Sequence, residues 1–325
     1  MLLVILLVAS AVLAVPPLAS AAPATPSVSL PPPPLTSFDS SPYRSLDLAR
    51  AARDEYGPTA TVVSVGNHLF DWRAQVWGRL KPLDLERAVR VQFGVDWSLV
   101  TVGVGRNDWK ALNISTLNYV VLPVMEVASD QWFDVVGVSQ GLSGFRSVLS
   151  ATRNWYKARA GRTFRLVQPI VIATDKTSAE WNAISASTEV PGDDPDRMNL
   201  LNELKRHYEG LFPLPGSRLA VAAAPYSGNS PDVWLGAADA GRFAIAPPRA
   251  TSVTCPFAGT QDARCGDAEY ALGHELGHAF GLAHSCDAFP DEVGCQNSIM
   301  QTGKPWTATL LQQEIDALKT SPFLH

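Results

Sequence analysis

His274 and His278, two histidines four residues apart, are the residues in this sequence best placed to bind one metal ion together. The segment Ala268–Phe280 is predicted to be a helix, and residues four apart on a helix share a face. Neutral imidazole is a good zinc ligand, so the pair can hold a single divalent ion. Glu275 is not placed to bind the metal, but it can act as a general base toward a water molecule there.

A third ligand must approach this ion from outside the helix, because a helix offers only one narrow face. At Gly281 the chain can leave the helix through positive φ, and a sharp turn there lets His284 return to the metal. Three protein ligands leave a fourth position for water, as in catalytic zinc sites. A glutamate from a later helix could be the third ligand instead, but His284 argues against it.

The residues from His274 to His284 read HELGHAFGLAH and resemble the extended zinc-binding signature of the metzincin peptidases. Ser285, directly after the third histidine, is similar to the matrixin-like branch. The resemblance also assigns the methionine turn of that family to Ser298–Gln301, with Met300 as the apolar floor under the metal. Thr302 stands where the astacin-like and serralysin-like branches carry a tyrosine ligand, so no such ligand is expected.

The resemblance implies a zinc-dependent endopeptidase with one catalytic Zn²⁺ and Glu275 as the base, acting on proteins or peptides. Such substrates lie extended along an edge strand, for which Val233–Ala238 is the candidate. Pro305 and Trp306 either wall the pocket for the residue after the cleaved bond or simply pack. The alternative function is a catalytically inactive zinc-binding extracellular adhesion module, and the intact Glu275 argues against it.

Residues 118–325 alternate between strand and helix patterns and predict an α+β fold with a mixed twisted sheet. This order of elements resembles a metzincin-like (zincin) catalytic domain: a strand, a long helix, further strands, the zinc-site helix and a C-terminal helix. The long helix is expected over Leu142–Ala160, with Gly161 as its stop. The other expected elements are strands at Tyr119–Val124, Phe164–Ala173, Arg218–Ala224, Val233–Ala238 and Phe243–Ala246, and helices at Arg197–Tyr208 and Ala308–Leu318.

A small N-terminal module, either an accessory domain or a propeptide, is predicted at residues 46–117. It is expected to contain a helix at Leu46–Tyr56 and strands at Thr61–Val65, Val89–Phe93 and Ser98–Val104. Core packing is favoured over a glycan-binding platform for its tryptophans, Trp72, Trp77, Trp97 and Trp109. No cysteine precedes Cys255, so latency through a cysteine is not expected; Asp96 could block the metal, but a solvated side chain is favoured.

Residues 1–21 are predicted to be a signal peptide, which makes the protein secreted. The apolar run Met1–Val15 is too short to span a bilayer, and Ala19–Ala21 has the small residues of a cleavage site, although no Lys or Arg precedes the run. A short membrane anchor is the alternative, and no stable membrane insertion is expected after cleavage. Residues 22–45 are rich in proline and serine and are predicted to be an extended linker.

The four cysteines of an exported chain suggest two disulfides. Proximity favours Cys255–Cys265 and Cys286–Cys295, although four cysteines allow three pairings. A bridge between Cys286 and Cys295 would hold His284 and Met300 in register. The net charge is −5 with scattered Lys and Arg, so no nucleic-acid partner is expected. The acidic run 193–196 could bind Ca²⁺, but a solvated loop is favoured; the oligomeric state is not determined by the sequence.

Overall fold

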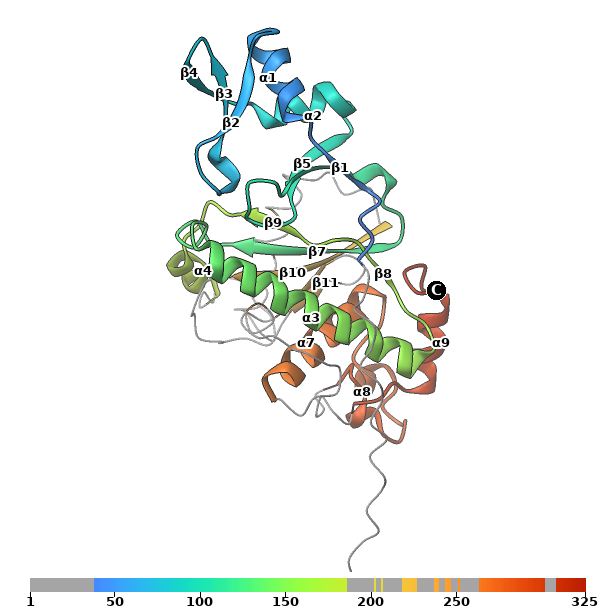
Figure 1. Ribbon diagram of the computed structural model, residues 1–325. Coiled ribbons are helices and arrows are strands. Elements are labelled where there is room, and N and C mark those ends of the chain that lie inside the picture. Colours follow the sequence, from blue (N-terminus) through green and yellow to red (C-terminus); the bar gives the residue numbers. More distant parts are fainter. Residues whose placement is uncertain are drawn as a thin grey trace, which may run out of the picture. The chain divides into compact units, whose positions relative to one another are not determined.

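The computed structural model describes residues 38–185, 218–226, 237–239, 243–246, 263–301 and 308–325, together with the single residues 202, 206 and 251. These residues form a mixed α+β fold (Figure 1). The first described elements are β1 (Tyr43–Ser45), α1 (Leu48–Tyr56), β2 (Thr61–Ser64), η1 (Leu69–Asp71), β3 (Trp72–Val76), β4 (Arg79–Pro82), α2 (Leu85–Phe93), β5 (Trp97–Thr101), β6 (Trp109–Asn113), η2 (Ile114–Thr116) and β7 (Val120–Val127). They are followed by α3 (Val135–Ala160), β8 (Arg165–Leu166), β9 (Ile170–Ala173), α4 (Ser178–Ser185), β10 (Leu219–Tyr226), β11 (Ala237–Asp239), β12 (Phe243–Ile245), α7 (Ala263–Ala279), α8 (Ser285–Ala288), η4 (Cys295–Asn297) and α9 (Gln312–Thr320).

The larger sheet is mixed, as the sequence predicts. Its strand order is β1–β6–β5–β9–β7–β10–β12–β11, and β8 also pairs with β7. Strands β8, β9 and β10 run parallel to β7, and β12 runs parallel to β10. The strands toward the two ends of this order pair antiparallel: β1 with β6, β6 with β5, β5 with β9, and β11 with β12. A smaller antiparallel sheet consists of β2, β3 and β4.

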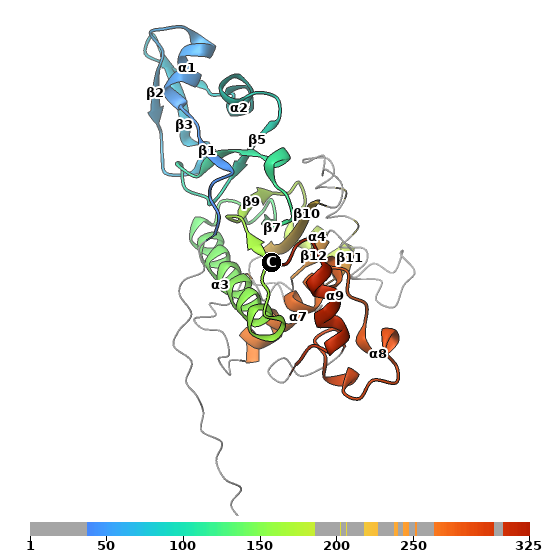
Figure 2. The same cartoon turned by 90° about the vertical axis from the view of Figure 1, so that its right-hand side faces the viewer.

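Strands β7 and β10 lie at the buried centre of the larger sheet. Every residue of both strands is buried, and alternate side chains enter two different cores. Val121 and Met125 pack in the core that contains α3 and α7, whereas Leu122 and Val124 pack in the core that contains Trp181 of α4. Continuous apolar strands of this kind are expected where parallel strands are covered on both faces. Figures 1 and 2 show α3 and α7 on the same side of the sheet.

The prediction of a strand at Val89–Phe93 is wrong, because these residues form the second half of helix α2. The Asp84 side chain accepts a hydrogen bond from a backbone N–H of the first turn at 2.8 Å and caps the helix. Gly94, with φ +103°, ends it. The β-branched valines favoured a strand locally, but the cap and the terminal glycine stabilise a helix whose buried residues lie on one face.

Two further predicted elements have different limits in the structure. The long helix α3 begins at Val135, well before the predicted Leu142, because Asp134 caps it by accepting from Gly137 N at 2.9 Å. It ends as predicted at Gly161, which has φ +69°. The predicted strand Phe164–Ala173 is divided into β8 and β9, since Pro169 between them has no N–H to donate to a ladder.

The C-terminal helices are both present with shifted starts. Helix α7 begins at Ala263 rather than Ala268, and α9 begins at Gln312 rather than Ala308. The predicted strand Val233–Ala238 is described only from residue 237, where β11 begins. Four predicted segments lie wholly or mostly outside the described residues: the predicted signal peptide, the predicted linker, the acidic run 193–196 and the predicted helix Arg197–Tyr208.

The boundary predicted after residue 117 stays a prediction. Helix α1 and the small sheet have a minor core of their own, centred on Ala52, Ala60 and Ala74. Strands β1, β5 and β6, however, extend the larger sheet, and they join its central strands through one registered pair, Thr101 with Val171. In the described part of the chain, no helix is both long and apolar enough to cross a membrane.

Candidate metal centre

Helix α7 presents His274 and His278 on one face, one turn apart. Their Nε2 atoms lie 3.1 Å from each other, and the two ring centroids are 4.7 Å apart with the rings nearly perpendicular. Two ligand atoms at about 2.0–2.1 Å from a tetrahedral zinc ion would be separated by roughly 3.3 Å. The pair is therefore spaced to share one ion after a small adjustment.

The chain turns sharply after α7 and brings His284 to the same place. The N–H of Gly281 donates to His278 O, and the N–H of Leu282 donates to Gly277 O, both at 2.9 Å. Gly281 has φ +100°, so this is a Schellman motif with glycine in the left-handed region. The His284 ring centroid lies 4.8 Å from that of His278, and the candidate ligand atoms of the three histidines are all within 4.8 Å of one another.

Each histidine of this cluster has a partner at its other ring nitrogen. Nδ1–H of His274 donates to Ile299 O at 2.6 Å, and Nδ1–H of His278 donates to Leu282 O at 2.8 Å. The Nδ1 atom of His284 lies 3.5 Å from a carboxylate oxygen of Asp287. With the proton held at Nδ1, each imidazole can direct its Nε2 lone pair to a metal. Burial lowers the pKa of His278, and the neighbouring His284 lowers it further, which favours the neutral ligand form despite the opposing bond to Leu282 O.

Met300 packs directly against α7 beneath the histidines and is fully buried. A Cβ atom at Gly277 would overlap the Met300 sulfur, and one at Gly273 would lie 2.8 Å from the Ile299 side chain. The two glycines therefore let the 299–300 segment approach the helix closely enough for Ile299 O to reach His274. This is the position in which the sequence predicts the methionine turn.

Glu314 of α9 is a buried acidic residue that binds the segments on both sides of the loop from His284 to Met300. The sequence did not predict this role. Glu314 is 1% exposed, and its carboxylate accepts from the hydroxyls of Ser285 and Ser298 and, at 2.8 Å, from the backbone N–H of Leu311. The Ser298 hydroxyl in turn accepts from Met300 N at 3.1 Å. The carboxylate thus joins the residue after His284 to the turn before Met300. Glu314 is the third residue of its helix, a capping position that could have indicated this role.

The predicted disulfide between Cys286 and Cys295 is present and closes the loop between His284 and Met300. The partner predicted for Cys265, Cys255, lies outside the described residues, as do Thr302, Pro305 and Trp306. Asp96 is exposed on the turn before β5 and does not belong to the metal-binding group. Glu275 is 6% exposed and lies on α7 beside His274.

No protein-family model matches this chain, and no curated protein does either. Two solved structures of OgpA from Akkermansia muciniphila are similar to it, one wild type and one catalytically inactive in complex with an O-glycopeptide (glycodrosocin) substrate. The wild-type structure is 14% identical and the inactive one 12%; each covers 64% of this chain, with a TM-score of 0.38. The chain spans about three fifths of those structures, 62% and 61% respectively.

Replacing Glu314 tests how far the histidine loop depends on its carboxylate. Glu314→Gln places an amide N–H₂ among three donors, so we expect the free energy of unfolding to fall by about 2–4 kcal/mol. Denaturant titration of the chelator-treated protein measures this loss. Asp316→Asn, which changes an exposed carboxylate of the same helix, is the control and should change stability by less than about 0.5 kcal/mol. Equal stability of the two variants would contradict the role given to Glu314.

Glu269 makes the stability of the fold depend on pH. One of its carboxylate oxygens is buried without a hydrogen bond among the described residues, and burial raises the pKa of Glu269 from 4.5 to about 7. The folded state then holds a proton that the unfolded state has released, so stability falls as the pH rises from about 4.5 to 7. Ionisation would cost at most about 3 kcal/mol.

The Glu269→Gln variant removes this ionisation and should be more stable than the parent at pH 8 and nearly equal to it at pH 4.5. The difference is measured by denaturant unfolding of the two chelator-treated proteins at both pH values. Glu292→Gln, the same substitution at a partly exposed glutamate, serves as the matched control. A stability difference that does not change with pH would show that burial does not perturb Glu269.

Proposed function

We propose that the protein is a zinc-dependent endopeptidase in which His274, His278 and His284 bind the metal and Glu275 is the catalytic base. The observation that carries this proposal is the cluster itself: three imidazoles whose ligand atoms lie within 4.8 Å, with Glu275 directly after His274 on the same helix. The resemblance of the helix and the following turn to the metzincin signature supports the same assignment.

The donor set fits zinc better than the common oxygen-binding cations. Calcium and magnesium prefer carboxylates, carbonyls and water, whereas neutral imidazole suits zinc. The backbone carbonyls of Ile299 and Leu282 orient two of the rings, and Asp287 lies beside the third. Orientation of ligands by such partners strengthens metal binding.

When bound, a zinc ion supplies Lewis acidity, which lowers the pKa of water and polarises a peptide carbonyl. The chain's own part would begin with the Glu275 carboxylate, which accepts the proton of the attacking water and delivers it to the leaving amine. Because the Glu275 side chain is 6% exposed, its charge acts where bulk water screens it little. Met300 offers no competing ligand from its buried position.

An extended substrate would be bound along β11, in the region that the sequence analysis assigned to the edge strand. Among the described strands, β11 is the last in its sheet and pairs antiparallel with β12 on one side only. Strand addition to such an edge is a common way to bind peptides. The N-terminal residues 46–117 would serve as an accessory or propeptide module to residues 118–325.

Secretion after removal of residues 1–21 belongs to the same proposal. The Cys286–Cys295 disulfide supports an oxidising compartment, because cytosolic thiols are kept reduced. A catalytically inactive zinc-binding module would share the metal and the location. The two functions differ in whether the zinc-loaded protein turns over a peptide substrate.

His284→Ala tests the third ligand. Loss of one of three imidazoles should weaken zinc affinity at least ~100-fold, measured by competition with a chromogenic chelator. His325→Ala at the C-terminus is the control and should bind zinc like the parent protein. An unchanged affinity in His284→Ala would place the third ligand elsewhere.

Glu275→Ala tests the base. The variant should retain one zinc per chain but lose about 10²–10⁴ in kcat/KM on a quenched-fluorescence peptide library, because proton transfer is lost and the ligands are not. Metal analysis and initial rates are measured on the same preparation. Turnover equal to that of the parent would refute the role of Glu275, and absence of turnover in the zinc-loaded parent would favour the inactive binding module.

A further inference from the structure

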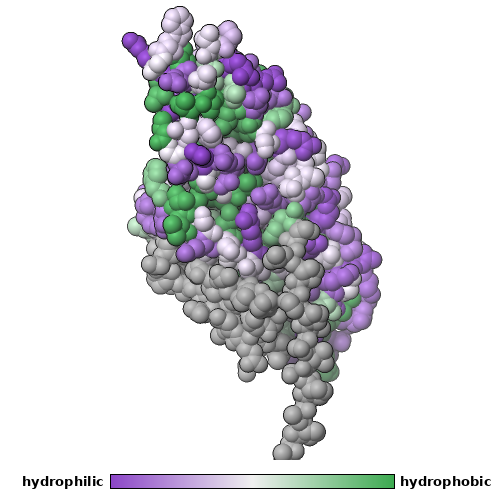
Figure 3. All heavy atoms as spheres, viewed as in Figure 1, coloured by the Kyte–Doolittle hydropathy of each residue, from purple (hydrophilic) through white to green (hydrophobic). Residues whose placement is uncertain are grey.

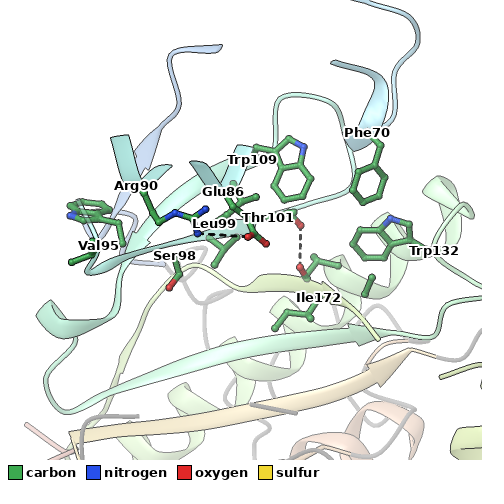
Figure 4. Close-up of a pocket in the computed structure, with 14 residues that line it drawn as sticks. Phe70, Glu86, Arg90, Val95, Ser98, Leu99, Thr101, Trp109, Trp132 and Ile172 are labelled. Atoms are coloured by element: carbon green, nitrogen blue, oxygen red, sulfur yellow. Dashed lines mark hydrogen bonds and ion pairs between the residues drawn. The ribbon is translucent and has the colours of Figure 1, made fainter. Parts of the chain in front are cut away.

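A cleft opens between β5 and β9, where the N-terminal strands join the central part of the sheet. The two strands are registered at one pair, Thr101 with Val171, and a cavity of about 520 Å³ lies beside this pair. Its walls include Leu99 and Val100 from β5 and Ile172 and Ala173 from β9 (Figure 4). This volume is within the range of ligand-binding pockets, roughly 300–1,000 Å³.

The backbone of β5 presents hydrogen-bonding groups to this cleft. The N–H of Val102 donates to Asp108 O at 3.0 Å, toward β6. Because N–H and C=O groups alternate in direction along an antiparallel strand, Leu99 and Thr101 direct theirs to the opposite side. Thr101 meets β9 there, whereas no described strand pairs with Leu99 on that side.

Strand β9 forms the complementary wall. The N–H of Thr174 donates to Val127 O at 3.0 Å, toward β7, so Val171 and Ala173 direct their backbone groups toward β5. Continuing the antiparallel register from Thr101 and Val171 would bring Leu99 opposite Ala173, but the described structure contains no such pair. Ala173 is exposed. In the described part of the chain, no strand pairs with Leu99 or Ala173 on this side, so the cleft lies between two strand edges.

One end of the cleft is aromatic. Phe70, Trp109 and Trp132 line it, with the Phe70 ring 5.7 Å from that of Trp109 and 6.1 Å from that of Trp132 between centroids. Trp132 is 5% exposed, yet its buried Nε1–H has no hydrogen-bond acceptor in the described structure. The aromatic end therefore offers a ligand ring surface rather than an accessible hydrogen-bond donor.

The surroundings of the cleft are amphipathic. Phe133 and Val136 are exposed near its aromatic end, and Figure 3 shows hydrophobic side chains gathered on this side of the molecule, at the upper left of the view. Arg90 and Glu86 of α2, whose charged groups are 3.9 Å apart, line the other end. A ligand here would meet apolar rings, strand-edge backbone and charges in succession (Figure 4).

We propose that this cleft binds an extended peptide segment by strand addition, with an apolar or aromatic side chain of the peptide among Phe70, Trp109 and Trp132. Backbone edges on both walls are the deciding feature, since a peptide matches their donor and acceptor spacing and a sugar does not. The site is separate from the histidine cluster. Strands β7 and β10 lie between the cleft and β12, against which α7 packs. The proposal therefore does not depend on the peptidase assignment.

The test uses fluorescein-labelled peptides of about seven residues, alternating threonine and valine, with phenylalanine, tryptophan, leucine, arginine or aspartate at the centre. Binding is measured by fluorescence anisotropy on the full-length Glu275→Ala chain, zinc-loaded and after chelation. We expect the phenylalanine, tryptophan or leucine peptide to bind, and the binding to survive chelation. Binding at the histidine site would be lost with the metal.

Three further substitutions, each made in the Glu275→Ala chain, test whether the peptide binds in this cleft. Ala173→Pro removes the N–H that faces the cleft, a position where proline spares the ladder to β7, and should weaken binding about tenfold or more. Ala173→Val keeps that N–H and should retain binding. Trp132→Phe keeps a ring but reduces the apolar surface at this end of the cleft and should weaken binding about fivefold. Circular dichroism confirms that each variant is folded.

Several outcomes would overturn the proposal. These are absence of binding by every peptide up to 1 mM, binding that is lost entirely on chelation, and binding unchanged in both Ala173→Pro and Trp132→Phe. Binding of a soluble hexasaccharide, but of none of the peptides, would also overturn it and would assign the aromatic end to glycans. None of these results bears on turnover at the histidine cluster.

Discussion

The carboxylate of Glu314 holds together three segments whose backbones otherwise meet through one isolated β-bridge, Ser298 with Thr309, and a bond from Ser285 N–H to Met300 O. The residue after His284, the turn before Met300 and the start of α9 each direct a donor to it, through Ser285, Ser298 and Leu311 N–H. A carboxylate buried to 1% exposure is tolerated only with such donors, because its desolvation is otherwise uncompensated. Since His284 lies outside α7, this set of bonds and the neighbouring disulfide determine where the third imidazole stands.

The other two histidines are positioned through the packing of α7. Tyr156 of α3 is buried and donates to Gly273 O at 2.7 Å, and α3 in turn packs on the central strands. On the same helix, the missing side chain of Gly277 makes room for Met300, so the 299–300 segment can supply a carbonyl to His274. Sheet, α3, α7 and the methionine segment thus pack closely one on the next, so a methyl group added at Gly277 would displace Met300 and disturb the contact between Ile299 O and His274.

The sequence predicts features formed by residues close together in the chain. It does not predict contacts that form only when distant helices and strands pack together. The spacing of the histidines and Gly281 is enough to expect a cluster, because a helix turn and a Schellman motif involve neighbouring residues. The second half of α2 was predicted as a strand because its valines favour strands, although Asp84 caps a helix there. Glu314 was not identified as a partner of Ser285, twenty-nine residues away, because that contact exists only after α9 has packed. The cleft beside Thr101 could not be predicted either, because it forms only where β5 and β9 pair at one position and then diverge.

The place where these strands separate is also where the sheet changes character. On one side of β9 the ladder is parallel and buried on both faces, and on the other it is antiparallel and half-exposed. One registered pair and the Thr101 hydroxyl, which donates to Val171 O at 3.1 Å, join the two parts. Differences in twist between two such ladders can be accommodated at this junction. A peptide can therefore bind between β5 and β9 without breaking the hydrogen bonds of either ladder. The histidine cluster, in contrast, depends on close packing of α7 against α3 and the methionine segment.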